Sequence, residues 1–360
     1  MSTIMKAFGK YLKEHRKQQQ FTLLDVSVEL HIDAAVISKI ESGKRTATRK
    51  QVSQFVSFFT LTEKEAYSTW LSDKILYDLH NEEYALDAFK VAEERIKYEV
   101  NQSKKVNKRD VKVDLLLKEA TALQKKWLDL KPLNKIQLEK MREYFNLNYT
   151  FESNLIEGNT LTLQETHLVV NEGLTISGKS MKEHLEVVNH SDAIDFIIEL
   201  VKNKEPFTER ILKEIHYLIL KGIDRVNAGI YRKVPVIISG SAHKPPQPFL
   251  LDKKMEDVFI FYNANKSKLH PVLLAAAMHQ KIVTVHPFID GNGRTCRLIM
   301  NLILMQHGYT IANLKGNNSS RLTYYKALES IQVNDTTLDF DTLIIKTTID
   351  SLNEHIALAE

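Results

Sequence analysis

A chain of 360 residues exceeds the length of one small domain, so two domains or one domain with an extension are expected. Hydrophobic residues make up 43% of the chain and charged residues 26%, whereas glycine (12 residues) and proline (8 residues) are sparse. This composition is typical of a soluble globular protein with a sizeable, mainly α-helical core. The single cysteine, Cys296, excludes a disulfide within the chain and is typical of the reducing cytoplasm.

Positive charge is concentrated at the N-terminal end of the chain. Residues 1–60 hold ten Lys and Arg against five Asp and Glu, which is a net charge of +5 in a chain whose total is +4. A basic module on a near-neutral body predicts a polyanionic partner for that module. The first residues contain no apolar signal-peptide core, and no stretch approaches the length of a membrane span. We therefore expect a cytoplasmic protein with no membrane partner.

Short amphipathic helices are predicted over residues 6–72. Thr22 and Asp33 are typical helix caps, and each precedes apolar residues at helical spacing. Residues 73–112 are densely charged with alternating signs, which is typical of an exposed connecting helix and a polar linker. Helical periodicity returns from residue 113 and lasts to residue 360. The sequence thus predicts three parts, 1–72, 73–112 and 113–360.

One stretch interrupts the helical pattern. Residues 230–250 alternate β-branched side chains around Ser-Gly-Ser and then pass through Pro245 and Pro246. This pattern predicts a β-hairpin over 234–249. An ordinary surface hairpin is the simplest interpretation of this stretch alone.

The stretch from His286 to Arg297, which reads HPFIDGNGRTCR, carries the strongest chemical signal. Residues 271–285 before it are apolar on nearly all sides and predict a buried helix that ends at the histidine, because a proline follows. A second apolar helix is predicted from near Arg294 to residue 308. A glycine-bounded loop that leads into a helix N-terminus offers free N–H groups and a favourable dipole to an anion.

The side chains on this loop suit phosphate chemistry. Arg294 and Arg297 lie three residues apart on the predicted helix and can bind successive phosphates. Asp290 can hold Mg²⁺ against phosphate oxygens, and His286 can accept a hydroxyl proton. The alternative, a purely structural corner, leaves two arginines at the unfavourable end of a helix dipole without an explanation. A P-loop is excluded because its glycine-lysine motif is absent.

The same stretch matches the signature H-x-F-x-x-G-N-G-R-x-x-R of the Fic family at every specified position, and the chain therefore resembles that family. The resemblance implies a helical Fic (Fido) fold that transfers AMP from ATP to a protein Ser, Thr or Tyr hydroxyl. It implies that His286 deprotonates the hydroxyl and that Asp290 carries Mg²⁺ at the α- and β-phosphates. The implied nucleotide ligands are Gly291, Asn292 and Gly293 at the α/β-phosphates, Arg294 at the β-phosphate and Arg297 at the γ-phosphate.

Upstream, Ser153-Asn-Leu-Ile-Glu157-Gly158 resembles the inhibitory motif of the family subclass that carries its inhibitory helix N-terminal to the signature. The resemblance places this helix around residues 150–160 and implies that Glu157 pairs with Arg297 in place of the γ-phosphate. Read by spacing alone, Ser153 to Glu157 is equally a routine helix start.

Two further segments resemble family elements. The predicted hairpin at 234–249 resembles the flap along which the target protein docks by strand addition. Tyr324 and Tyr325 resemble a segment that lines the nucleotide base, although an aromatic pair on an amphipathic helix is more often core packing.

Residues 6–60 resemble the lambda-repressor-like helix-turn-helix family, most specifically through the stretch Ile37 to Arg45. The resemblance implies DNA binding by residues 1–72. It places the predicted helix 33–42 in the major groove, with Ala34 and Ala35 at its start offering no hydrogen-bond donors to bases. A helical docking domain with a basic face is the alternative. The implied DNA contacts are Ser38 and Lys39 near base edges and Lys44 and Arg45 at phosphates.

The sequence thus predicts an autoinhibited protein adenylyltransferase that uses ATP and Mg²⁺. Three alternatives stay open: transfer of another nucleotide or of phosphate, removal of AMP from a modified protein, and a transcriptional regulator that senses ATP without turnover. The sequence does not reveal which protein is the target, whether the chain modifies itself, which DNA operator is bound or whether the chain forms a homo-oligomer.

Overall fold

The structure is a computed structural model that describes residues 7–79, 82–103, 111–130 and 134–360. The chain divides into two compact units, Met1–Asn107 and Lys108–Glu360. The predicted boundary at residue 72 falls inside a helix, because that helix continues past the buried Trp70. The predicted linker 73–112 includes the helix α6 (Ala85–Ser103), and its residues 104–110 lie outside the described residues.

The N-terminal unit packs five helices around one apolar core. Capping boxes start two of the helices, with Thr22 and Asp25 at α2 and Thr48 and Gln51 at α4. Gly9 lets α1 lie against α3, since a Cβ there would collide with the carbonyl oxygen of Ile40. The helices are α1 (Ala7–Gln18), α2 (Leu23–Leu30), α3 (Ala34–Glu41), α4 (Arg49–Phe59) and α5 (Glu63–Asp78).

A three-residue turn joins α2 to α3. Its first residue, His31, adopts the left-handed conformation with φ of 54°, and Asp33 caps α3 by accepting a hydrogen bond from Ala35 N. A shielded bidentate ion pair ties α1 to α3, with Arg16 Nε and Nη2 at 2.6 and 2.8 Å from the Glu41 carboxylate. Both residues lie in the stretch that resembles helix-turn-helix proteins, and here they hold the bundle together.

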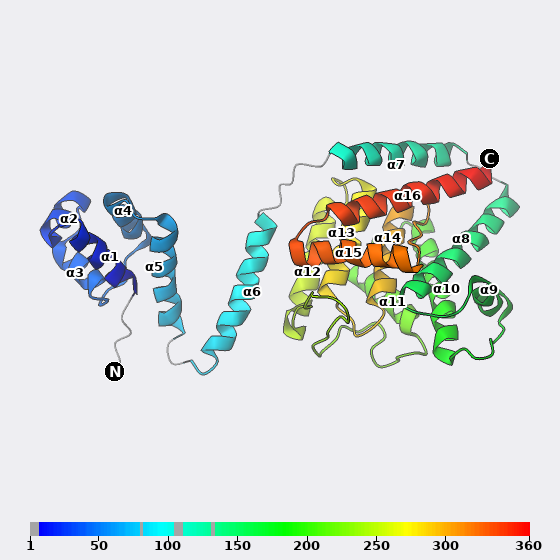
Figure 1. Ribbon diagram of the computed structural model, residues 1–360, viewed down its shortest axis with the longest axis horizontal. Helices are drawn as coiled ribbons and strands as arrows, with labels where there is room; N and C mark the ends of the chain where they lie inside the picture. Colours follow the sequence, from blue (N-terminus) through cyan, green and yellow to red (C-terminus); the bar gives the residue numbers. More distant parts are fainter. Residues whose placement is uncertain (1–6, 80–81, 104–110, 131–133) are drawn as a thin grey trace. The chain divides into compact units, whose positions relative to one another are not determined.

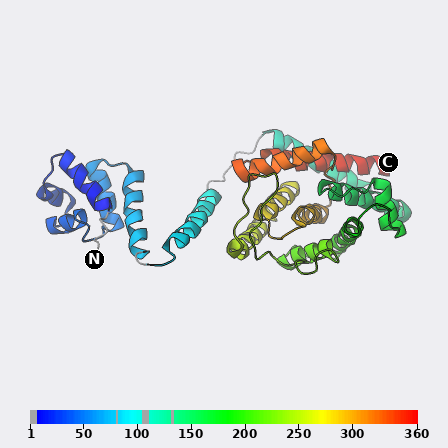
Figure 2. The ribbon, with the colours of Figure 1, turned by 60° about the horizontal axis from the view of Figure 1, so that its bottom comes forward.

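The C-terminal unit surrounds two central helices with a shell of others. The central pair is α13 (Pro271–Val285) and α14 (Asn292–Gln306), and nearly every side chain of α14 is buried. Figures 1 and 2 show this pair inside the surrounding helices. The shell consists of α7 (Val111–Asp129), α8 (Lys135–Ile156), α9 (Leu163–Glu172), α10 (Met181–Lys202), α11 (Glu209–Leu220), α12 (Leu251–Asn265), α15 (Asn318–Asn334) and α16 (Leu338–Ala359), with a 3₁₀ turn η1 (Pro248–Leu250) before α12.

The helix predicted over 271–285 is confirmed as α13, and the second predicted helix is confirmed as α14, which begins at Asn292. Gly291, with φ of 75°, is the N-cap of α14, so the helix starts two residues before Arg294. As a result, Gly293 and Arg294 already belong to its first turn.

The hairpin predicted over 234–249 is not observed. None of the residues that the structure describes forms a β-strand, and residues 230–247 form an irregular loop. Proline residues explain the absence of pairing, because they remove backbone donors along the loop. Arg232 holds the arms of the loop instead, donating from Nη1 to Val234 O and from Nη2 to Pro246 O. The prolines are Pro235, Pro245, Pro246 and Pro248.

Across the residues with described structure, no helix combines the length and apolar composition that a bilayer crossing requires.

Candidate functional site

The loop between α13 and α14 is closed by the side chain of Asn292. Its Oδ1 accepts a hydrogen bond from Phe288 N at 3.0 Å, and its Nδ2 donates to Phe288 O at 2.9 Å. The side-chain amide of Asn292 therefore holds the loop in shape. The N–H groups of the first turn of α14 have no partner within the helix and stay available to an anion.

Arg297 is fully buried and is held by the end of α8. Its Nε donates to Ser153 Oγ at 3.0 Å, and its Nη2 donates to Ser153 O at 2.8 Å and to Glu157 Oε1 at 2.7 Å. Burial alone lowers the pKa of Arg297, but the adjacent Glu157 carboxylate raises it above its usual value. Nη1 has no hydrogen-bond partner among the described residues. A buried guanidinium with one unused nitrogen is suited to a second anionic partner.

Glu157 lies directly over the first turn of α14. A Cβ at Gly293 would collide with the Glu157 carboxylate and come within 3.1 Å of Arg297 Nη1. The space that the glycine leaves is therefore filled by the carboxylate. Gly158, with φ of 95°, turns the chain away immediately after Glu157. Ser153, Glu157 and Gly158 thus lie together at the C-terminal end of α8.

Arg294 is 2% exposed and faces two carboxylates. Its Nη1 is 3.1 Å from Glu186 Oε1, and its Nη2 is 3.7 Å from Asp290 Oδ1. Glu186 lies on α10 and also accepts a hydrogen bond from Asn159 Nδ2 at 3.0 Å. Nε of Arg294 has no hydrogen-bond partner within the described part of the chain. Glu186 was not among the predicted site residues, because its only signal in the sequence is an acidic residue on the apolar face of a predicted helix.

His286 ends α13 in the left-handed conformation, with φ of 50°. Burial lowers the pKa of His286 to about 4, with a smaller contribution from the nearby Arg232 guanidinium. The imidazole is therefore neutral at pH 7 and can accept a proton. Arg232 donates from Nε to His286 O at 2.8 Å and from its backbone N to Pro287 O at 2.9 Å, which joins the loop 230–247 to the site.

Asp290 fits a single-carboxylate magnesium site. Its side chain is half exposed, and among the described residues only Oδ1 has a hydrogen bond, from Gly291 N at 2.6 Å. Mg²⁺ in nucleotide sites takes one or two protein carboxylates and completes its shell with phosphates and water. The orphaned nitrogens of Arg294 and Arg297 lie beside the same helix start, where those phosphates would sit.

The two tyrosines proposed to line the nucleotide base have different surroundings. Tyr324 is buried and its hydroxyl lies 3.1 Å from His279 Nε2, which agrees with the core-packing interpretation. Tyr325 is 40% exposed, and its hydroxyl donates to Ile156 O at 3.1 Å. Tyr325 therefore contacts the residue that directly precedes Glu157.

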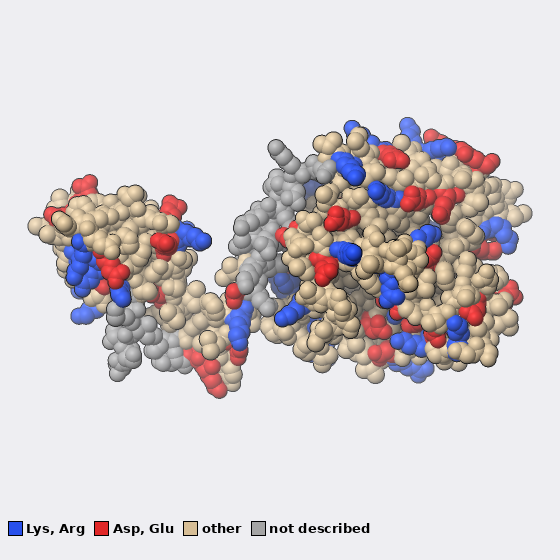
Figure 3. All heavy atoms as spheres, viewed as in Figure 1, with Lys and Arg blue, Asp and Glu red and all other residues tan. Residues whose placement is uncertain are grey.

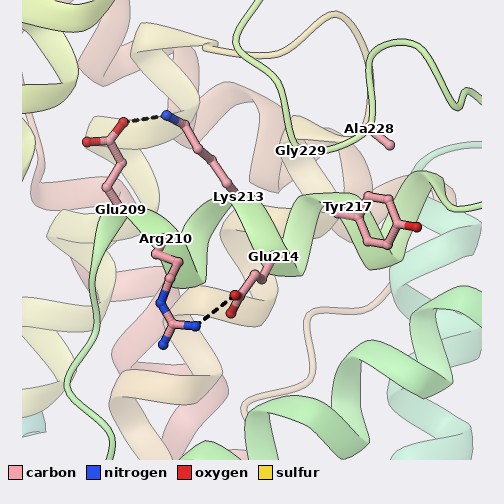
Figure 4. A pocket seen from close by; sticks show the side chains of 7 residues that line it. All are labelled: Glu209, Arg210, Lys213, Glu214, Tyr217, Ala228 and Gly229. Atoms are coloured by element: carbon pink, nitrogen blue, oxygen red, sulfur yellow. Dashed lines mark hydrogen bonds and ion pairs between the residues drawn. The ribbon is translucent and has the colours of Figure 1, made fainter.

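A shallow hollow lies along α11, and Figure 4 shows the residues that line it. Its charged side chains neutralise each other, with Lys213 Nζ 2.7 Å from Glu209 and Arg210 Nη1 2.9 Å from Glu214. None of the predicted site residues lines it. The candidate site at the start of α14 therefore lies outside this hollow.

The residues proposed to contact DNA all lie at the surface of the N-terminal unit. Ser38 and Lys39 on α3 and Lys44 and Arg45 after it are exposed. Figure 3 shows Lys and Arg side chains gathered on the lower part of this unit, with some acidic atoms among them. The surface is thus accessible and carries basic groups.

Together, the helical core and the loop that it presents define a Fic-type domain. The Fic/DOC family model matches residues 206–304. A crystal structure of a Fic domain containing signaling protein from Bacteroides thetaiotaomicron is 30% identical, with a TM-score of 0.61 over 67% of this chain and 96% of that one. The chain belongs to the Fic/DOC family.

Other relatives agree with this assignment. The protein adenylyltransferase Fic of Nematostella vectensis is 35% identical over 207 residues, which are 57% of this chain and 47% of the relative. The protein of the same name from Drosophila grimshawi is 39% identical over 171 residues, which are 47% of this chain and 35% of the relative. The chain thus spans less than half the length of these relatives. Fic-1 (residues 134–508) from C. elegans, at 23% identity and a TM-score of 0.60 over 98% of both chains, shares the fold.

Proposed function

We propose that this chain is a protein adenylyltransferase that moves AMP from ATP to a Ser, Thr or Tyr hydroxyl of a protein, and that Glu157 inhibits it. The observation that carries the proposal is the buried guanidinium of Arg297, which binds Glu157 and keeps one nitrogen unused beside the α14 N-terminus. The names of the sequence relatives support the same activity.

In the proposed reaction, the target hydroxyl oxygen attacks the α-phosphorus and its proton passes to the neutral imidazole of His286. The bond between the α-phosphorus and the bridging oxygen breaks, and pyrophosphate leaves with the electron pair. Arg294 and Arg297 neutralise the β- and γ-phosphates, and the free N–H groups of the α14 start hold the phosphate oxygens. Mg²⁺ held by Asp290 would offset the charge of the triphosphate.

The proposed inhibition follows from competition for one guanidinium. A carboxylate bound to Arg297 occupies the position that the γ-phosphate needs, so ATP binds in the wrong orientation or not at all. Burial strengthens the pair, because removal of water lowers the local dielectric. Displacement of the α8 end would free Arg297 and expose the first turn of α14.

The test of the activity is the fate of each phosphate. When the Glu157→Gly variant is incubated with ATP labelled at either the α- or the γ-phosphate, we expect label on protein only from α-labelled ATP, with equimolar pyrophosphate released. Mass spectrometry should find a 5′-AMP adduct. Label from the γ-phosphate would instead support phosphate transfer. Absence of label from both positions, with DNA occupancy unaffected by His286→Ala, would support an ATP sensor without turnover.

We also propose that the target lies along residues 230–247. Val234 is half exposed and Ile237 is almost fully exposed, so this loop presents apolar side chains, and Arg232 joins the loop to the His286 carbonyl. Its arms have no strand partner in the described structure and are joined by Arg232. An extended target segment can add its own backbone hydrogen bonds to such a loop.

For the N-terminal unit we propose DNA binding. Two short helices joined by a three-residue turn and an exposed basic stretch after the second helix support this proposal. The methyl side chains of Ala34 and Ala35 at the start of α3 favour weak base discrimination.

Reversal of two charges tests this binding. We expect Lys44→Glu with Arg45→Glu to weaken binding of the full chain to any duplex and to reduce the slope of log affinity against log salt by about 2, since each lost phosphate contact contributes about 0.9. Fluorescence anisotropy between about 50 and about 200 mM salt measures both effects. The matched control, Lys64→Glu with Lys74→Glu on α5, makes the same charge change. Equal losses in both double variants would argue against a DNA site at α3.

A further inference from the structure

His216 on α11 is a buried imidazole with both nitrogens engaged. The backbone N–H of Gly229 donates to His216 Nδ1 at 2.9 Å, and His216 Nε2 lies 2.9 Å from Asp290 O. Because an N–H only donates and a carbonyl only accepts, Nδ1 is the acceptor and Nε2 carries the proton. The two hydrogen bonds therefore require one tautomer of the neutral ring.

Packing holds this ring in one orientation. It lies flat on the buried ring of Phe288, with centroids 3.6 Å apart and planes 6° apart. Gly291 lies close to the same ring, since a Cβ there would come within 3.4 Å of His216 Nε2 and within 3.3 Å of Ile219. Gly291 adopts a positive φ and caps α14, so the imidazole supports the peptide that joins Asp290 to the helix start.

We infer that His216 is a positioning residue for the magnesium–nucleotide complex: its Nε2–H holds the main chain of Asp290 so that the carboxylate is presented to the metal. The inference rests on the proposed function, because it assumes that Asp290 carries Mg²⁺. Loss of a group that hydrogen-bonds to a metal ligand and orients it typically changes metal affinity by about 10- to 100-fold. The second hydrogen bond, from Gly229, ties the start of the loop 230–247 to the same ring.

Substitution of His216 by asparagine or by glutamine tests the roles of its two ring nitrogens separately. The amide of asparagine reaches the place of Nδ1, and that of glutamine reaches the place of Nε2. His216→Gln therefore keeps a donor to Asp290 O and loses the acceptor for Gly229 N, whereas His216→Asn does the reverse. His216→Phe keeps the stacking on Phe288 and loses both hydrogen bonds.

The experiment uses the full chain with Glu157→Gly as the parent and measures ATP binding by calorimetry with Mg²⁺ and with EDTA. We expect His216→Asn and His216→Phe to raise the Mg²⁺ concentration for half-maximal binding by about tenfold or more, and His216→Gln to stay within about threefold of the parent. ATP affinity in EDTA should be the same in all four proteins. The Mg²⁺ dependence of α-labelling should shift in parallel.

Three results would overturn the inference. One is an unchanged Mg²⁺ requirement in the Asn and Phe variants. Another is an equal loss of ATP affinity in EDTA, which indicates a general structural defect. The third is failure of both the Asn and Phe variants to fold, judged by circular dichroism and thermal melting. If the parent binds Mg²⁺–ATP but labels no protein, the proposed transfer fails while the calorimetric comparison still decides the role of His216.

Discussion

Glu157→Gly is expected to raise self-labelling from α-labelled ATP by roughly 10- to 100-fold, since a hydrogen-bonded ion pair of this kind contributes about 1.5–3 kcal/mol. The variant removes the carboxylate that lies 2.7 Å from Arg297 Nη2. Ser153 still orients the guanidinium through Nε and Nη2, so the arginine keeps its position and exchanges one anion for another. ATP affinity measured by calorimetry should rise together with the rate.

Two controls isolate the charge of Glu157. Glu157→Gln keeps the size of the side chain and should activate in the same direction, because a neutral amide pairs less strongly with Arg297. Glu143→Gln changes an exposed glutamate on the same helix, where it pairs with Lys140 at 2.8 Å, and should leave labelling unchanged. Equal labelling in the wild-type and Glu157→Gly proteins would remove the inhibitory role from Glu157.

Adding His286→Ala to the Glu157→Gly variant is expected to reduce labelling by about 10³-fold, within the range that general base catalysis contributes. ATP binding should persist, because the arginines and the α14 start remain intact. Calorimetry of ATP binding and quantitative α-labelling separate the two effects. His307→Ala at the far end of α14 is the matched histidine control, and it should label like the parent. Labelling that survives His286→Ala would exclude the imidazole as the base.

The pH dependence of the Glu157→Gly variant follows from the depressed pKa of His286. Burial lowers that pKa to about 4, so the proton-accepting form persists well below the usual histidine value of about 6.5. The labelling rate should therefore stay nearly constant as pH falls from about 7.5 to about 5.5, where an ordinary histidine would lose about 90% of its neutral form. A tenfold fall over this range would contradict the environment described for His286.

The signature loop was predictable because its chemistry is local. His286, Asp290 and the two arginines lie within one turn and its flanking helices, and a proline and two glycines mark where the helices end and begin. The structure adds that Gly291 caps α14, which therefore begins at Asn292, just before the first arginine. The short N-terminal helices were legible for the same reason, since caps such as Thr22 and Asp33 act on their own helices.

Only the tertiary structure decided which residues contact the side chains of the signature loop, because contacts between distant helices leave little trace in local sequence patterns. Arg297 meets Ser153 and Glu157 across about 140 residues, a pairing that only the family resemblance indicated. Glu186 and His216 belong to no motif that the sequence shows.

The predicted hairpin over 234–249 was legible in the sequence but is not observed. Alternating β-branched residues favour a strand there, but prolines and the Arg232 side chain hold that stretch as a loop. Local patterns thus predicted where helices begin and end and which groups carry charge. The packing of helices from distant parts of the chain decided which charges face each other, because burial allows an arginine such as Arg297 only the partners that the fold brings within hydrogen-bond distance.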